Sequence, residues 1–222
     1  MVKVKICGIT DKADALAAAD YGCDGLGFIF YKKSPRYISP GKAREIISAL
    51  PPRVVKIGVF VNNREKSIKA IARECRLDML QFSGSETPEF CRRFKNFKVI
   101  KAFKVKNKIN SAQVLRYRTF AYLFDTFSPG YFGGTGKTFN WKFLASDLSG
   151  LKSPIFLAGG LNEKNVLEAV KTVNPAWVDA SSSLETSPGK KDLDKVKRFI
   201  ARAKFNSSFF DLKTGGWNAQ AK

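Results

Sequence analysis

The stretch GLGFIFYKKSPRYISPGKAREIISALPP, residues 25–52, contains the repeating unit that predicts the fold. Its opening six residues, GLGFIF, form a continuous apolar run, which is typical of a parallel strand buried on both faces. The turn-forming sequence SPRYISP comes next, and the segment after it has the composition of a helix that stops at Pro51 and Pro52. The predicted unit is therefore one buried strand followed by one helix.

The same unit recurs through the chain. Strands are predicted over residues 2–7, 25–30, 54–61, 78–82, 99–105, 121–125, 154–159 and 176–181. The helices that follow them are predicted over residues 11–22, 41–50, 64–75, 87–96, 111–118, 140–145, 162–173 and 192–204. Eight such units predict an α/β protein whose strands close into a (β/α)8 TIM barrel. A doubly wound open sheet is the alternative, but it normally has fewer strands, and the first turn, KICGITDK, lacks the G-x-G-x-x-G fingerprint.

Length and composition indicate one globular domain. The chain has 222 residues, of which 44% are hydrophobic, and single α/β barrels commonly have about 200 to 250 residues. We expect a catalytic barrel domain over residues 1–204. An irregular extension is expected over residues 205–222, whose aromatic side chains could pack on the barrel or form a contact surface.

The chain is strongly basic. It has 39 Lys and Arg against 19 Asp and Glu, a formal net charge of +20. This excess favours acidic ligands and would also support nonspecific contact with nucleic acid. Because the basic residues are spread along the chain without an arginine-rich arm, we expect a solvated Lys-rich surface and no specific nucleic-acid partner.

The four cysteines show no metal-binding pattern. None of them forms a C-x-x-C pair, and the chain has no histidine, so no metal site is expected. The first residues, MVKVKICGIT, enter a strand directly and do not read as a signal peptide. No apolar run approaches the ~18 residues of a membrane span. Free thiols in the cytoplasm, away from any membrane, are the expectation.

The sequence GYFGGTGKT, residues 130–138, invites comparison with a nucleotide-binding P-loop. That motif requires a glycine, four further residues and then Gly-Lys-Ser/Thr. The required first position is Tyr131, because Gly130 comes one residue too early. The loop therefore does not fit the P-loop register, although its amides remain suited to covering a phosphate.

Barrel enzymes carry their reactive groups at the C-terminal ends of the strands. Cys7 ends the first predicted strand, Arg36 follows the second, and Asp125 ends the sixth. The seventh and eighth strands end in small residues, which let backbone amides approach an anion in the sector where barrels often bind phosphate. The predicted phosphate-binding residues are Gly159, Gly160, Ser181 and Ser182, with Gly133, Gly134 and Gly136 of the loop after the sixth strand.

These residues occur within a longer set of motifs: VKICGIT, GFIF with SPRYIS, KIGVFVN, DTFSPGYFGGTGKTFNW, FLAGGLNEKNV and VDASSSLETSPGKKD. Together, in this order and over residues 2–204, they resemble phosphoribosylanthranilate isomerase, the barrel enzyme of tryptophan biosynthesis. The resemblance implies an Amadori rearrangement of N-(5-phosphoribosyl)anthranilate to the open-chain carboxyphenylamino-deoxyribulose phosphate. It implies no cofactor, and a monomer or a homodimer acting on a small phosphorylated aminosugar. Other phosphate-binding barrels, such as the indole-glycerol-phosphate enzymes, lack the pairing of KICGIT with GGTGKTF.

The resemblance also implies roles for individual side chains. Asp125 would be the general acid and Cys7 the general base, Arg36 would bind the anthranilate carboxylate, and Asp179 would contact sugar hydroxyls. A carboxyl group donates a proton at neutral pH only if its pKa is raised, and a cysteine accepts one only as thiolate. Lys5 lies two residues before Cys7 on the same face of the strand, so its charge is suited to favouring that thiolate.

Each residue also has a structural explanation when taken alone. Cys7 would fill a core, Asp125 would cap a turn, and Arg36 would be a surface charge. Gly159 with Gly160 would form a tight turn, and Ser181 with Ser182 would cap a helix. Their joint placement on one face of the barrel favours the enzyme. A catalytically weakened barrel that binds a phospholigand or a protein partner is the alternative, and nonspecific nucleic-acid binding, with steep salt dependence, is a third.

Two positions depart from the pattern of the family. Ser83, in QFSG, stands where a histidine is common, and Ser183 stands where a glycine is usual. The first removes a potential charge near the substrate and is expected to affect affinity more than turnover. The second adds a Cβ atom beside the phosphate sector, which would lower phosphate affinity if the backbone there needed a positive φ.

Overall fold

The computed structural model of the chain describes residues 1–105, 109–125, 141, 147–148 and 150–204. Most of the helix predicted over residues 140–145, and the whole extension over residues 205–222, lie outside these described residues. No helix within the described part of the chain is long and apolar enough to cross a membrane.

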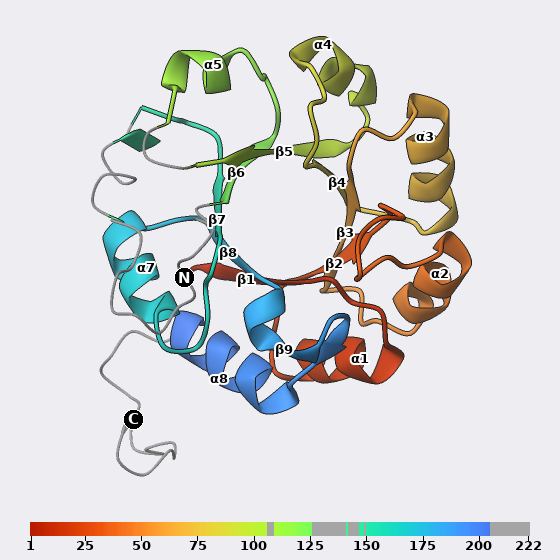
Figure 1. Ribbon diagram of the computed structural model, residues 1–222, viewed down its shortest axis with the longest axis vertical. Coiled ribbons are helices and arrows are strands. Elements are labelled where there is room, and N and C mark those ends of the chain that lie inside the picture. Colours follow the sequence, from red (N-terminus) through yellow and green to blue (C-terminus); the bar gives the residue numbers. More distant parts are fainter. Residues whose placement is uncertain (106–108, 126–140, 142–146, 149, 205–222) are drawn as a thin grey trace.

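Eight parallel strands close into a barrel in the order of the sequence (Figure 1). They are β1 (Lys3–Cys7), β2 (Gly25–Ile29), β3 (Val55–Phe60), β4 (Met79–Phe82), β5 (Lys98–Lys104), β6 (Ala121–Asp125), β7 (Ile155–Ala158) and β8 (Trp177–Ala180). Pairing of β8 with β1 closes the barrel, with Val178 opposite Val4 and Asp179 opposite Lys5. The predicted TIM barrel is therefore confirmed, and the open sheet was the wrong alternative.

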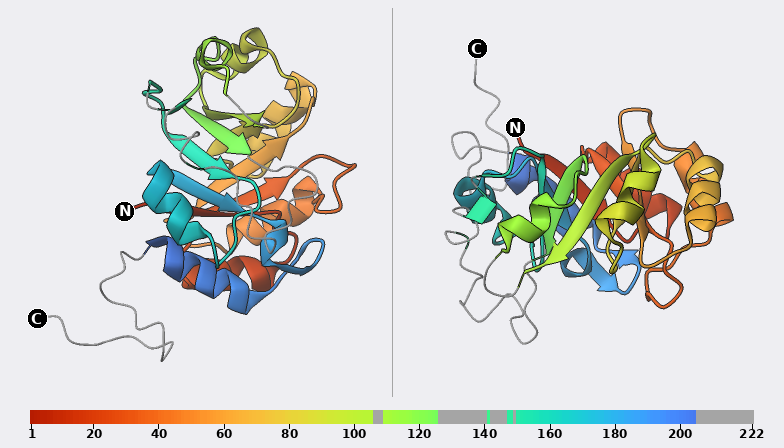
Figure 2. Two further views of the ribbon diagram at one scale, coloured as in Figure 1. Left: turned by 60° about the vertical axis from the view of Figure 1, so that its left-hand side comes forward. Right: turned by 90° about the horizontal axis from the view of Figure 1, so that it is seen from above.

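Helices surround the barrel on its outer side (Figures 1 and 2). They are α1 (Lys12–Asp20), α2 (Pro40–Ser48), α3 (Glu65–Glu74), α4 (Pro88–Cys91), α5 (Ser111–Leu115), α7 (Val166–Val173) and α8 (Leu193–Lys204). Local chemistry sets several starts, since the side chains of Asp11, Ser39 and Thr87 accept bonds from backbone amides in the first turns. Proline at the first position of α2 and α4 also suits a helix start.

Apolar side chains form two clusters, one on each side of the barrel wall. The outer cluster packs the strands against the helices. The inner cluster lies inside the barrel and consists of Ile57, Met79, Ile100, Ala121, Leu123, Phe156, Ala158 and Trp177. It extends from the first residue of β8, Trp177, to the last residue of β7, Ala158, so the polar side chains inside the barrel lie beside an apolar filling.

A short hairpin interrupts the chain between β8 and α8. Its strands are β9 (Glu185–Ser187) and β10 (Lys190–Lys191), joined through Gly189 at a φ of 87°. A 3₁₀ turn, η2 (Ser182–Leu184), precedes it. Figure 2 shows this blue hairpin on the side toward which the barrel strands point. The sequence pattern did not predict the hairpin, because its strands are short and polar and carry no alternation.

Candidate active site

A cavity of about 280 Å³ opens at the C-terminal ends of the strands. It is lined by side chains from the last positions of β1, β6 and β8 and from the turns that follow β2, β7 and β8. The predicted site residues that line it are Cys7, Arg36, Asp125, Gly159, Gly160, Asp179, Ser181 and Ser182. Gly133, Gly134 and Gly136 lie outside the described residues. The structure thus brings together every predicted site residue that it describes.

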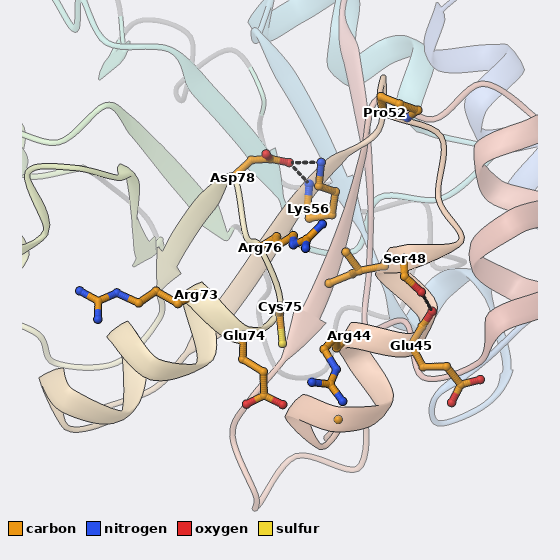
Figure 3. Close-up of a pocket in the computed structure, with 12 residues that line it drawn as sticks. Arg44, Glu45, Ser48, Pro52, Lys56, Arg73, Glu74, Cys75, Arg76 and Asp78 are labelled. Carbon is orange, nitrogen blue, oxygen red and sulfur yellow. Dashed lines mark hydrogen bonds and ion pairs between the residues drawn. The ribbon is translucent and has the colours of Figure 1, made fainter.

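A larger cavity, of about 1160 Å³, lies outside the barrel between α2 and the end of α3 (Figure 3). Charged side chains such as Arg44 and Glu74 surround it, and an ion pair of 2.8 Å joins Lys56 to Asp78 at the starts of β3 and β4. None of the predicted site residues that the structure describes lines this cavity. Since barrel chemistry takes place at the opposite ends of the strands, the smaller cavity is the candidate active site.

Cys7 lies at the mouth of the barrel with only 7% of its surface exposed. Burial raises the pKa of this thiol, Lys5 and Lys191 lower it in part, and Asp179 raises it further. The net pKa is above the ordinary value, so the unliganded protein holds Cys7 as a thiol. The lowered pKa that a resting thiolate requires is therefore not found in this state.

A buried polar layer lies beneath Cys7. The Nζ atom of Lys5, which is 0% exposed, lies 2.7 Å from Oδ2 of Asp179 and 2.7 Å from Oε1 of Gln81. Burial raises the pKa of Asp179 against the opposing effect of Lys5, and the charge of Asp125 raises it further. The second carboxylate oxygen of Asp179, Oδ1, is buried without a hydrogen-bond partner among the described residues. It therefore offers an acceptor to a ligand in the cavity.

Ser83 extends this layer toward the cavity. Its Oγ accepts a hydrogen bond of 3.0 Å from Nε2 of Gln81, the residue that also binds Lys5. Ser83, the residue that stands where a histidine is common, therefore orients the side-chain amide of Gln81. The substitution removes a titratable group but keeps a polar lining.

Arg36 is held by an acidic partner from the hairpin. Its Nε lies 2.9 Å from both carboxylate oxygens of Glu185, and its Nη2 lies 2.7 Å from Oε2. Lys191 bonds the same carboxylate at 2.8 Å and the carbonyl oxygen of Cys7 at 2.7 Å. Burial acts to raise the pKa of Glu185, but the hydrogen bonds from Arg36 and Lys191 lower it below its ordinary value. Burial lowers the pKa of Lys191. These three side chains together carry one net positive charge at the rim.

Glu185 and Lys191 are functional neighbours that the sequence analysis missed. They fall in a polar segment without periodicity, and Glu185 is 149 residues from Arg36. No spacing rule connects positions so far apart. The only available signal was their position directly after the eighth strand, where barrel loops build active sites.

The phosphate sector combines glycines with small hydroxyl side chains. Gly159 and Gly160 have φ values of 96° and 67°, a backbone conformation that glycine adopts at little cost. The Oγ atom of Ser181 is buried and has no partner among the described residues. Ser183 is not among the described non-glycine residues with positive φ, so the Cβ atom that it adds causes no backbone strain there. Its hydroxyl instead donates a hydrogen bond to the carbonyl oxygen of Leu161.

Two glycines allow close packing around the site. A Cβ atom on Gly8, whose φ is 77°, would lie 2.7 Å from Cδ of Arg36 and 2.9 Å from Oγ of Ser181. A Cβ atom on Gly27 would lie 2.6 Å from Sγ of Cys7 and 3.1 Å from Cε of Lys5. Three of these four distances are shorter than real Cβ contacts, and the fourth, 3.1 Å, is tighter than most of them. The two glycines therefore leave the room that the site side chains occupy.

Gly27→Ala is accordingly expected to displace the sulfur of Cys7. Overpacking of this kind costs about 1–3 kcal/mol of unfolding free energy, and we expect turnover of any substrate that reacts at Cys7 to fall with it. Urea denaturation and steady-state kinetics measure the two effects. Gly41→Ala is the matched control, because a Cβ at that exposed helix position meets nothing within 4 Å. Unchanged stability and turnover in Gly27→Ala would show that the site tolerates the extra atom.

Comparisons with known proteins agree with this geometry. Residues 4–202 match the family model described as N-(5'phosphoribosyl)anthranilate (PRA) isomerase. The N-(5'-phosphoribosyl)anthranilate isomerase of Geotalea uraniireducens is 50% identical over 204 residues, which cover 92% of this chain and 99% of the relative. The phosphoribosyl anthranilate isomerase of Thermotoga maritima has a crystal structure that is 46% identical, with a TM-score of 0.86 over 92% of this chain and 99% of its own.

A second solved structure of such an isomerase contains a ligand. It is in complex with reduced 1-(o-carboxyphenylamino)-1-deoxyribulose 5-phosphate. That protein is 43% identical to this chain, with a TM-score of 0.83 over 92% of this chain and 99% of its own. Its ligand combines a carboxylate, a sugar chain and a phosphate.

Proposed function

Since the chain belongs to the N-(5'-phosphoribosyl)anthranilate isomerase family and catalyses that family's reaction in tryptophan biosynthesis, we propose that Cys7 and Asp125 perform the chemistry. One observation carries this proposal. Cys7 ends β1, Asp125 ends β6, and both line the same cavity at the mouth of the barrel. A proton acceptor and a proton donor would thus face a sugar bound in this cavity.

The reaction needs one acid and one base in succession. Asp125 gives a proton to the ring oxygen as the bond from that oxygen to C1 breaks, and the glycosylamine becomes an open-chain iminium ion. Cys7, as thiolate, then takes the proton from C2 of the sugar, which yields an enolamine. Tautomerisation of the enolamine gives the aminoketose. The steps rearrange hydrogen within the substrate and consume no oxidant or reductant.

The remaining lining residues suit the rest of the substrate. We propose that the amides and hydroxyls of Gly159, Gly160, Ser181 and Ser182 hold the phosphate, together with Gly133, Gly134 and Gly136 outside the described residues. We propose that Oδ1 of Asp179 accepts a hydrogen bond from a sugar hydroxyl. We also propose that Arg36 binds the anthranilate carboxylate with the part of its guanidinium that Glu185 leaves open. The net positive charge at the rim complements that carboxylate.

Arg36→Lys tests the carboxylate site. Lysine keeps the charge but loses the planar fork and its fixed contacts with Glu185. A hydrogen bond to a charged group contributes about 1.5–3 kcal/mol, so we expect KM to rise by about 10- to 100-fold with a much smaller change in kcat. Arg53→Lys is the control, because Arg53 bonds the carbonyl oxygen of Ala19 away from the cavity. A drop in kcat without a change in KM would argue against a binding role.

A fluorescence assay tests the activity itself. Phosphoribosylanthranilate is generated in situ from anthranilate, the protein is added, and loss of the aminosugar's fluorescence is followed. We expect a rapid decay that depends on protein concentration. A flat trace at high protein concentration would instead favour a barrel that only binds phospholigands or protein partners.

The setting of the reaction is also a proposal. All four cysteines are free thiols, which fits a reducing cytoplasm. We propose that the chain works there as a monomer or a homodimer, and sedimentation at several protein concentrations distinguishes the two.

A further inference from the structure

A lysine occupies the interior of the barrel directly beneath the catalytic mouth. Lys5 is fully buried, and its ammonium group is held by the carboxylate of Asp179 from β8 and the side-chain amide of Gln81 from β4. Burial of a cation is costly unless partners compensate for lost water. Two short hydrogen bonds from opposite sides of the barrel fix the Lys5 ammonium at this depth. The role proposed above for Asp179 does not require a cation here.

The same lysine packs beside Cys7. The two residues are two positions apart on β1, so both side chains point into the barrel. Sγ of Cys7 and Cε of Lys5 approach one point on β2, the position that a Cβ on Gly27 would occupy, to within 2.6 and 3.1 Å. A side chain larger than hydrogen at residue 27 would therefore collide with Cys7 and crowd Lys5. The missing Cβ on β2 thus leaves room for the base and the cation at the same spot inside the barrel.

Cys7 needs such a cation because burial disfavours its charged form. The charged groups facing it come from several elements. They are Lys5 of β1, Asp179 of β8, Lys191 of β10, and Arg36, Lys104 and Asp125, which line the cavity. Lys191 and Arg36 are both bonded to Glu185. Lys5 favours the Cys7 thiolate more than Lys191 does, and Asp179 opposes it.

We propose that Lys5 is a positioning residue that holds and stabilises the Cys7 thiolate while this residue acts as base, and that Asp179 controls how strongly it does so. This inference rests on the function proposed above, in which Cys7 is the base. Asp179 competes with the thiolate for the ammonium. When a substrate hydroxyl donates a hydrogen bond to Oδ1 of Asp179, the carboxylate attracts the ammonium less, and the thiolate is favoured. Substrate binding thereby helps to ionise Cys7, which then removes a proton from the substrate.

The test measures ionisation of Cys7 without substrate. Iodoacetamide reacts with the thiolate, so the rate of alkylation of the Cys7 peptide, followed by mass spectrometry against pH, gives the midpoint of ionisation. In Lys5→Met the midpoint is expected to rise by about one to two pH units, since a close opposite charge shifts a pKa by that amount. Alkylation below the midpoint should slow by about tenfold per unit. In Asp179→Asn the midpoint should move the other way.

Opposite shifts from two neighbouring substitutions distinguish charge from simple packing damage. The rising limb of the kcat/KM profile should also move to higher pH in Lys5→Met, because removal of the cation disfavours the thiolate. If Lys5→Met fails to fold, the comparison of Asp179→Asn with the double variant Lys5→Met/Asp179→Asn replaces it, since removing both partners of a buried pair is tolerated better than removing one. The double variant should then have the higher midpoint.

Equal midpoints with and without Lys5 would overturn the inference. If instead the proposed function were wrong, Cys7→Ser would retain turnover, while the ionisation midpoints of Cys7 would still move. Inactive Cys7→Ser together with an unmoved midpoint would reject the role of Lys5 alone. The alkylation readout needs no bound substrate, so the place of Asp179 in substrate binding does not disturb it.

Discussion

Cys7→Ser is expected to lower kcat by about 10²- to 10⁴-fold, the range that a general base contributes to catalysis. A serine hydroxyl ionises far less readily than a thiol, and Lys5 cannot compensate for that difference. Serine is close in shape to cysteine, so thermal unfolding should change little. KM should also change little, because the phosphate and carboxylate contacts remain in place. The fluorescence assay measures both constants.

The matched control is Cys75→Ser. Cys75 is also buried, and its Sγ lies 3.4 Å from the carbonyl oxygen of Pro40, where a hydroxyl can donate equally well. It lines the outer cavity of Figure 3 and not the barrel mouth. Turnover should therefore survive this substitution. Wild-type-like turnover in Cys7→Ser would remove Cys7 from the mechanism.

Asp125→Asn is expected to reduce kcat by a similar factor, about 10²- to 10⁴-fold. The amide keeps the size of the side chain but has no acidic proton to deliver to the ring oxygen. The fluorescence assay measures this loss, and KM should change little because the phosphate and carboxylate contacts remain in place.

Asp78→Asn serves as the control for the carboxylate. Asp78 precedes β4 at the other end of the barrel, where it bonds the backbone amide and the Nζ atom of Lys56, both at 2.8 Å. Loss of this pair should affect stability slightly and leave kcat intact. If Asp125→Asn kept normal turnover, another group would have to protonate the sugar.

The strands and the positions of Cys7 and Asp125 at strand ends were predictable because local rules govern them, whereas the proton-transfer roles of these two residues came from the resemblance to the family. Parallel strands buried on both faces must be apolar along their length, as GLGFI of β2 is. Once eight such runs are counted, the last residue of each strand lies at the mouth of the barrel. The positions of Cys7 and Asp125 followed from this counting alone. The reading of Gly159 and Gly160 as cavity-lining residues followed in the same way.

The electrostatics of the site were not predictable by these rules. The raised pKa of Cys7 comes chiefly from burial, together with the charge of Asp179, which lies 172 positions away in the sequence. Period-two spacing placed Lys5 on the face of Cys7, but it could not show that Gln81 and Asp179 would hold the ammonium. Glu185 was missed for the same reason, since ion pairs between distant segments leave no local pattern.

The hairpin of β9 and β10 also bears on the order in which the protein matures during synthesis. Translation delivers Cys7 and Arg36 early, whereas Glu185 follows Arg36 by 149 residues and Lys191 follows Cys7 by 184. Nascent chains generally fold from the N-terminus as they leave the ribosome. The contacts of Arg36 with Glu185 and of Lys191 with the carbonyl oxygen of Cys7 can therefore form only after the hairpin has left the ribosome, so the rim of the cavity is completed late in synthesis.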